Sequence, residues 1–139
     1  MERITMKEYN DQQALYDIGK NYYNDTNNCS VVAVAISTGV AYGAAFKALE
    51  KRGRKRGQGV SNFNILKAIV DLGFMPDRVE GNYKTVRTIT DRLPKEGKYL
   101  VLVSGHILAV RDGKVLDWTE GRMHRIEEVF KVTPREYKK

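Results

Sequence analysis

YLVLVSGHILAVRDGKVLDW, residues 99–118, specifies both a local structure and a candidate chemistry. Two apolar runs rich in β-branched residues flank Asp112-Gly113, the dipeptide best suited to a two-residue type I′ turn, because both central residues of that turn need positive φ. The turn fixes the register of a β-hairpin and places Arg111 opposite Lys114. The sequence therefore predicts an antiparallel hairpin whose facing residues can be counted outward from the turn.

Counted in this way, His106 and Asp117 fall on the same face of the hairpin as diagonal neighbours. Diagonal positions lie roughly 7–8 Å apart, within reach of polar side chains, so we expect the Asp117 carboxylate to hold one ring N–H of the imidazole. Because side chains alternate between the two faces of a strand, Trp118 is expected on the face opposite His106, where it would pack against the other side of the sheet. His124 is expected on an outer strand.

The rest of the C-terminal half also favours strands. Residues 99–103 are continuously apolar, as expected of a central strand buried on both faces, and Ser104-Gly105 is expected to form a kink or bulge. The run HRIEEVFKVT, residues 124–133, is predicted to be an edge strand protected by its charges. Residues 76–82 are predicted to be a connection, and the polar tail from about residue 134 is expected to fray.

The N-terminal half favours helices. CSVVAVAI, residues 29–36, is apolar almost all round, so periodicity alone does not separate a buried helix from a strand. We predict a helix because cap-forming residues precede it and Thr38-Gly39 offers a stop. Further helices are predicted at about 10–22, from 40 or 41 to the basic loop, from 61 or 62 to 73, and just before Pro94. The core-facing stripes expected on the first and the fourth helix are Leu15, Ile18 and Tyr22, and Phe63, Leu66 and Val70.

These patterns predict an α+β fold in which an N-terminal helical layer, including the buried Cys-bearing helix, packs on a C-terminal antiparallel β-sheet. The 139 residues and 42% hydrophobic composition fit a single domain, residues 1–139. The single cysteine fits a reducing compartment, and no run approaches the roughly 18 apolar residues of a membrane span. A cytoplasmic protein with no membrane partner is therefore expected.

Basic residues are concentrated in one loop. The net charge is +7, and KRGRKRGQG, residues 51–59, carries five basic residues and no acid. A charge run of this kind is usually a solvated loop, and it lacks the aromatic residues that single-stranded nucleic acids stack on. A nucleic-acid or protein partner is the alternative, and its candidate contacts are Arg52, Arg54, Lys55 and Arg56.

Cys29 lies in the first turn of the predicted buried helix, where unpaired backbone N–H groups and the positive end of the helix dipole lower the pKa of a thiol. A lone cysteine is more often a small buried hydrophobic residue, but this one stands at the junction of a polar and an apolar stretch. A cysteine nucleophile needs a base and a third group that orients the base. Cys29, His106 and Asp117 supply one of each.

Several short motifs of the chain recur together in one known group of proteins. They are Asn27-Asn28-Cys29, Ser37-Thr38-Gly39, Arg54 to Gly59, Gly97-Lys98-Tyr99, Ser104-Gly105-His106, Ala109-Val110, Asp112-Gly113 and Asp117-Trp118. In these motifs, over roughly residues 20–125, the chain resembles small phage-encoded proteins of the papain-like cysteine peptidase superfamily, akin to the C39-like, bacteriocin-processing peptidases. The resemblance implies a papain-like fold, a Cys29–His106–Asp117 triad and, for a phage protein, the host cytoplasm. It implies no substrate.

One position departs from the papain-like pattern. Such enzymes commonly place a glutamine six residues before the cysteine to stabilise the oxyanion, and here that position is Tyr23. Asn24 is the nearest amide that would substitute, with Asn27 and Asn28 behind it, and the backbone N–H of Cys29 would be the second donor. Losing one oxyanion donor typically lowers the rate by a factor of roughly 10² to 10³.

Three functions compete. The first is a thiol hydrolase or transferase, peptidase-like or isopeptidase-like, that acts without a cofactor on a protein or peptide through an acyl-enzyme at Cys29. The second is a non-catalytic phage-type binding protein on the same scaffold, which captures a host protein or nucleic acid through the basic loop. The third, a zinc site built from Cys29, His106, Asp117 and His124, is disfavoured because none of them shows the short spacing of zinc ligands.

Overall fold

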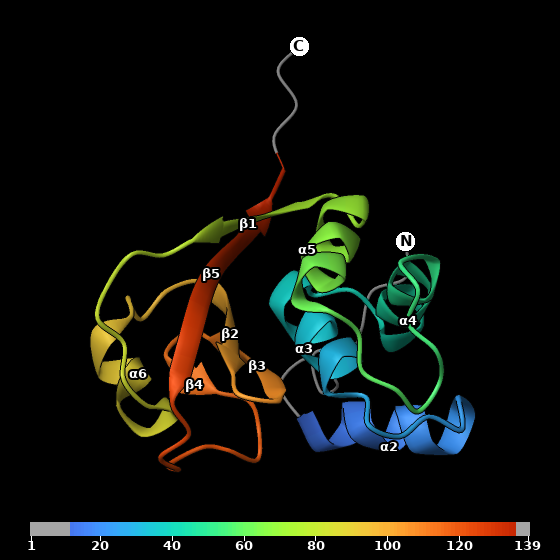
Figure 1. The fold of residues 1–139 in the computed structure, drawn as a ribbon, viewed down its shortest axis with the longest axis horizontal. Helices are drawn as coiled ribbons and strands as arrows, with labels where there is room; N and C mark the ends of the chain where they lie inside the picture. The colour runs from blue at the N-terminus through green and yellow to red at the C-terminus, as the bar shows by residue number, and fades with distance from the viewer. Residues whose placement is uncertain (1–11, 136–139) are drawn as a thin grey trace.

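The computed structural model describes residues 12–135, which form five α-helices and a five-stranded antiparallel β-sheet (Figure 1). The predicted α+β class is confirmed. The predicted start of the first helix and the end of the polar tail lie outside the described residues. The helices are α2 (Gln12–Tyr22), α3 (Cys29–Thr38), α4 (Tyr42–Lys51), α5 (Asn62–Asp71) and α6 (Val86–Arg92). The strands are β1 (Phe74–Arg78), β2 (Lys98–Val103), β3 (His106–Arg111), β4 (Lys114–Val115) and β5 (Ile126–Pro134).

Helix α3 lies at the centre of the helical layer, so the prediction of a helix rather than a strand is confirmed. All of its residues after Cys29 are buried. Its C-terminus ends as expected, because Gly39 adopts φ 80° and donates its backbone N–H to the Ala35 carbonyl. A helix that is apolar all round must be covered on every side, and α3 is packed between β3 and the neighbouring helices.

The other helices form where expected, but the buried faces of α2 and α5 differ from the prediction. On α2, Leu15 is buried whereas Tyr22 is 81% exposed. On α5, which packs against α4 and β1, the buried residues are Ile65, Ala68 and Ile69. Of the predicted stripe, Leu66 packs against the core in part, whereas Phe63 is 67% exposed. No helix within residues 12–135 is both long enough and apolar enough to cross a membrane.

The sheet has the strand order β1-β5-β2-β3-β4, and every neighbouring pair is antiparallel. The predicted central strand is confirmed, since β2 lies in the middle. The prediction of β5 as an edge strand was wrong, because β5 pairs on both sides and β1 covers its outer side. Of the predicted connection 76–82, residues 76–78 belong to β1, and only 79–82 connect elements. The edge position of β1 suits Pro76, which has no N–H for a second partner.

Two tight turns set the strand ends. Asp112 and Gly113 have φ of 49° and 80°, the positive values that a type I′ turn needs, and the expected Arg111–Lys114 pair is confirmed. Ser104-Gly105 is a turn between β2 and β3 and not a kink within one strand, because Val103 pairs with His106.

Helices lie on both sides of the sheet, with α6 apart from the other helices (Figure 1), and each face of the sheet carries a hydrophobic core. One core lies between the sheet and helices α2 to α5, and the other lies under α6. Leu108, Val110 and Val115 share the α6 core, as the alternation predicts, whereas Ile107 and Ala109 face the helical layer. With both faces covered, the ends of the strands are where polar side chains of the sheet can meet α2 and α3.

We predict that Gly113→Ala lowers the free energy of unfolding by about 1–2 kcal/mol, because an L side chain is strained at φ 80°. Urea denaturation measures the change. Gly59→Ala is the matched control, since no atom lies within 4 Å of the added Cβ and no positive φ is involved. Equal stability of the two variants would contradict the turn assignment.

Candidate active site

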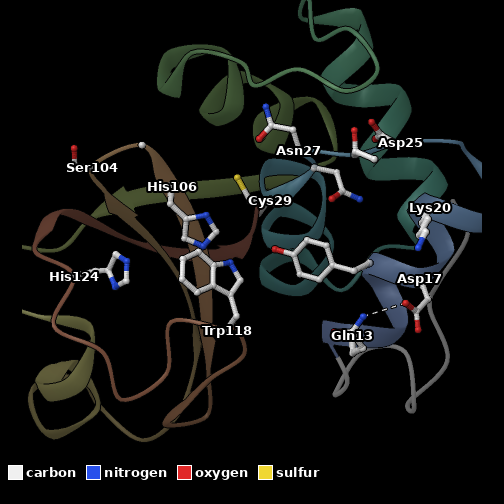
Figure 2. Close-up of a pocket in the computed structure, with 14 residues that line it drawn as sticks. Gln13, Asp17, Lys20, Asp25, Asn27, Cys29, Ser104, His106, Trp118 and His124 are labelled. Carbon is white, nitrogen blue, oxygen red and sulfur yellow. Dashed lines mark hydrogen bonds between the residues drawn. The ribbon is translucent and has the colours of Figure 1, made fainter.

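A cleft of about 660 Å³ opens where α2, the start of α3 and the β2–β3 turn meet. Figure 2 shows Cys29 beside His106 on one side, with Gln13, Asp17 and Lys20 along α2 on the other. A second hollow of about 270 Å³ shares Cys29 and His106 with the cleft and is otherwise lined mainly by different residues. The sulfur thus lies where two depressions join.

Cys29 is the first residue of α3 and is half-buried. Burial alone would raise the pKa of its thiol, and so would the negative charge of Asp117. A hydrogen bond with His106, the charge of that imidazole and a hydrogen bond from the Ile107 backbone N–H outweigh both and lower the pKa below its usual 9.0. The helix dipole adds to this preference for the thiolate.

The predicted contact between His106 and Asp117 is confirmed. His106 donates its Nε2–H to Asp117 Oδ2 at 2.8 Å, and the two side chains are only 10% and 3% exposed. The same oxygen accepts the Thr119 hydroxyl at 2.6 Å and the Thr119 backbone N–H at 3.2 Å. Thr119, which the sequence analysis missed, is fully buried and fixes the carboxylate.

The surroundings of His106 favour its charged form. Burial alone would lower the pKa of the imidazole, but hydrogen bonds and charges from Asp117 and Cys29 raise it from 6.5 to about 9. The lowered pKa of the thiol and the raised pKa of the imidazole both favour a thiolate–imidazolium pair. The geometry thus yields a nucleophile and a proton donor in contact.

Trp118 and His124 do not lie where the sequence predicted. Strand β4 ends at Val115, so the alternation does not continue to Trp118, and the chain turns within residues 117–122. The indole lies beside His106, with ring centroids 5.0 Å apart, and meets the His124 ring edge-on at 5.4 Å. His124 precedes β5 and lines the cleft, as Figure 2 shows.

The candidate oxyanion amides differ in their access to the cleft. Asn27 is exposed and lines it, and Asn28 lines it but is buried and donates its side-chain N–H to the Tyr42 hydroxyl at 2.9 Å. Asn24 is exposed and is absent from the cleft lining. Tyr23, at the usual glutamine position, packs on the Tyr42 ring with centroids 5.0 Å apart.

A buried polar network, which the sequence analysis missed, holds the segment before Cys29. The Asp25 carboxylate accepts two hydrogen bonds from Arg54, at 2.9 and 3.0 Å, one from the Tyr42 hydroxyl at 2.9 Å and one from the Gly57 N–H at 2.8 Å. Asp25, Arg54 and Tyr42 are at most 4% exposed. These bonds lower the pKa of Asp25 against the effect of its burial and keep it charged.

This network changes the interpretation of the basic loop. Arg54 is not a surface residue available to a partner, because its guanidinium is buried and forms an ion pair with Asp25. Arg52 forms an exposed pair with Asp71, with its Nε 2.7 Å from the carboxylate. Lys55 and Arg56 are exposed. The four predicted contacts therefore do not form one basic surface.

The chain matches no protein-family model, no curated protein and no solved structure. Within residues 12–135, no group of three or more His, Cys, Asp or Glu side chains is placed to hold a metal ion.

We predict that Arg54→Ala destabilises the protein by about 3–5 kcal/mol, because it leaves the Asp25 carboxylate buried without its cation. Arg56→Ala, in the same loop but exposed, should change stability by less than about 1 kcal/mol. Chemical denaturation of both variants makes the comparison. Similar effects of the two substitutions would contradict the assigned burial of Arg54.

We predict that alkylation of Cys29 by iodoacetamide reaches half its maximal rate below pH 9.0, because the thiolate is stabilised by the His106 imidazolium. His106→Gln removes this cation, so its midpoint should move to higher pH. Rates measured across the pH range test this, with glutathione as the free-thiol reference. An unchanged midpoint in His106→Gln would show that the imidazole does not act on the thiol.

Proposed function

We propose that this protein is a thiol hydrolase or transferase of the papain-like, C39-like type, which acts on a peptide or isopeptide bond through an acyl-enzyme at Cys29. The observation that carries the proposal is that His106 interacts with both Asp117 and Cys29. One ring nitrogen is bound to the buried Asp117 carboxylate at 2.8 Å, and the imidazole also hydrogen-bonds the Cys29 thiol. A nucleophile, a base and an orienting group are thus in contact.

The surrounding architecture supports the same proposal. The helical layer supplies the thiol from the start of a fully buried helix, and the sheet supplies the imidazole from the first residue of β3. This division between a helical part and a sheet is what the papain-like resemblance implies. The proposal therefore includes a papain-like fold within the α+β class.

The chemistry follows from the charged pair. The Cys29 thiolate attacks the carbonyl carbon, and the carbonyl π electrons move to oxygen to give a tetrahedral oxyanion. His106 then gives its proton to the leaving amine, which departs and leaves a thioester on Cys29. In hydrolysis, His106 takes a proton from water as the water attacks the thioester carbon; the C–S bond then breaks, the carboxylic acid leaves and the proton on His106 returns to the sulfur. In transfer, a second amine replaces the water and the product is a new amide. Asp117 and Thr119 keep the imidazole aimed throughout.

The shape of the site supports a peptide-like substrate. The cleft and the second hollow, about 660 and 270 Å³, meet at the sulfur and leave room on more than one side of the reacting carbonyl. A non-catalytic partner function of the 51–59 loop is less well supported, because Arg54 is buried and Arg52 is paired with Asp71.

We predict that the protein cleaves or transacylates members of a peptide library and that Cys29→Ala abolishes this reaction. Mass spectrometry detects the new peptide ends and the thioester adduct on Cys29. Circular dichroism and the melting temperature of Cys29→Ala should match the wild type, since the thiol is only half-buried. Turnover that survives in Cys29→Ala, or a Cys29 that reacts no faster than glutathione, would refute the proposed function.

A further inference from the structure

The proposed reaction needs two hydrogen-bond donors at the oxyanion, and the usual side-chain donor is missing. Tyr23 takes the place of the glutamine, but its ring packs on Tyr42 and Phe46 inside the helical layer, with centroids 5.0 and 5.1 Å away. Asn24 is absent from the cleft lining, and Asn28 already donates to Tyr42. Asn27 does line the cleft but is exposed, so a donor shielded from water must come from another side of the cleft.

Helix α2 forms that side. It packs against both α3 and α4 and turns Gln13, Tyr16, Asp17 and Lys20 toward the cleft that contains the sulfur. Asp17 has no proton to donate at neutral pH, and the Gln13 amide donates to Asp17 at 3.0 Å. Lys20 lies at the exposed end of the helix, one turn beyond Tyr16.

Tyr16 is placed differently from these neighbours. It is half-buried and packs, as Cys29 does, against the core of the helical layer, and the charges of Cys29 and Asp117 act on its hydroxyl. Burial, followed by these negative charges, raises the pKa of the phenol well above 10. With its pKa raised in this way, the phenol keeps its proton at neutral pH and can donate a hydrogen bond into the cleft that it lines.

We propose that the Tyr16 hydroxyl is the second oxyanion donor and that it acts together with the backbone N–H of Cys29. This inference rests on the proposed function. When the Cys29 sulfur bonds to the carbonyl carbon, the π pair becomes the negative charge on oxygen, and the Tyr16 O–H donates a hydrogen bond to it without giving up its proton. The bond then weakens as the oxyanion collapses and expels the leaving group.

A half-buried donor is well suited to this role. It is held in place before the charge develops, in surroundings with less water than the surface, where each hydrogen bond to an oxyanion stabilises the transition state more strongly. The carbonyl of the ground state is a weaker acceptor than the oxyanion, so the effect falls mainly on the acylation rate.

The experiment compares two reactions of the same sulfur in Tyr16→Phe. p-Nitrophenyl acetate acylates Cys29 through a tetrahedral oxyanion and releases p-nitrophenolate, whereas iodoacetamide alkylates the thiolate by displacing iodide and forms no oxyanion. Tyr16→Phe keeps the ring and removes only the hydroxyl. We expect its acylation rate to fall about 10²-fold, the loss typical of one oxyanion donor, and its alkylation rate to change less than about 2-fold.

Tyr22→Phe is the matched control, because Tyr22 lies on the same helix but is 81% exposed, and both of its rates should equal those of the wild type. If Tyr16→Phe slows both reactions equally, the hydroxyl acts on the thiolate or the fold and the proposal fails. Unchanged acylation in Tyr16→Phe also overturns it. A wild-type Cys29 that alkylates no faster than glutathione would instead refute the proposed function itself.

Discussion

The complete burial of α3 is the constraint on which the rest of the structure depends. Its residues after Cys29 are enclosed by the sheet and the other helices. Only the two ends of a helix have backbone groups without a partner in the helix, so these ends need polar surroundings. The C-terminal end is closed by Gly39. The N-terminal end faces the cleft, and the buried Asp25–Arg54 pair ties down the chain that leads into it. The position of the thiol thus follows from the packing of the helix behind it.

The parts of the fold that follow local rules could be predicted from the sequence. Asp112-Gly113 selects one type of turn, and from it the register of the hairpin follows, because each residue changes face in order. The His106–Asp117 contact was predicted by continuing this alternation, yet the structure reaches it differently. Strand β4 ends at Val115, and Thr119 holds the carboxylate after the chain has turned. The contact is correct although part of its derivation is not.

The parts that depend on distant partners could not be predicted. Asp25 lies in a run of Asn, Asp and Thr typical of loops, and nothing local distinguishes it as the partner of a buried arginine 29 residues away. Arg54 likewise looked like one of several solvated charges. The buried face of α5 was ambiguous because Phe63 and Ile65 begin two overlapping apolar stripes, and only the position of α4 and β1 selects between them. Such choices are made by packing and not by periodicity.

The two tight turns of the sheet also limit how such a protein can diverge. The two-residue lengths of Ser104-Gly105 and Asp112-Gly113 select the turn types that set the register of β2, β3 and β4, so a change in length would require another turn type. The segment from Trp118 to Arg125 carries no strand ladder beyond a single bridge, and α2 contributes to the core mainly through Leu15 and Gly19. Apart from Tyr16, substitutions along these two borders would therefore change the shape of the cleft without altering the paired sulfur and imidazole.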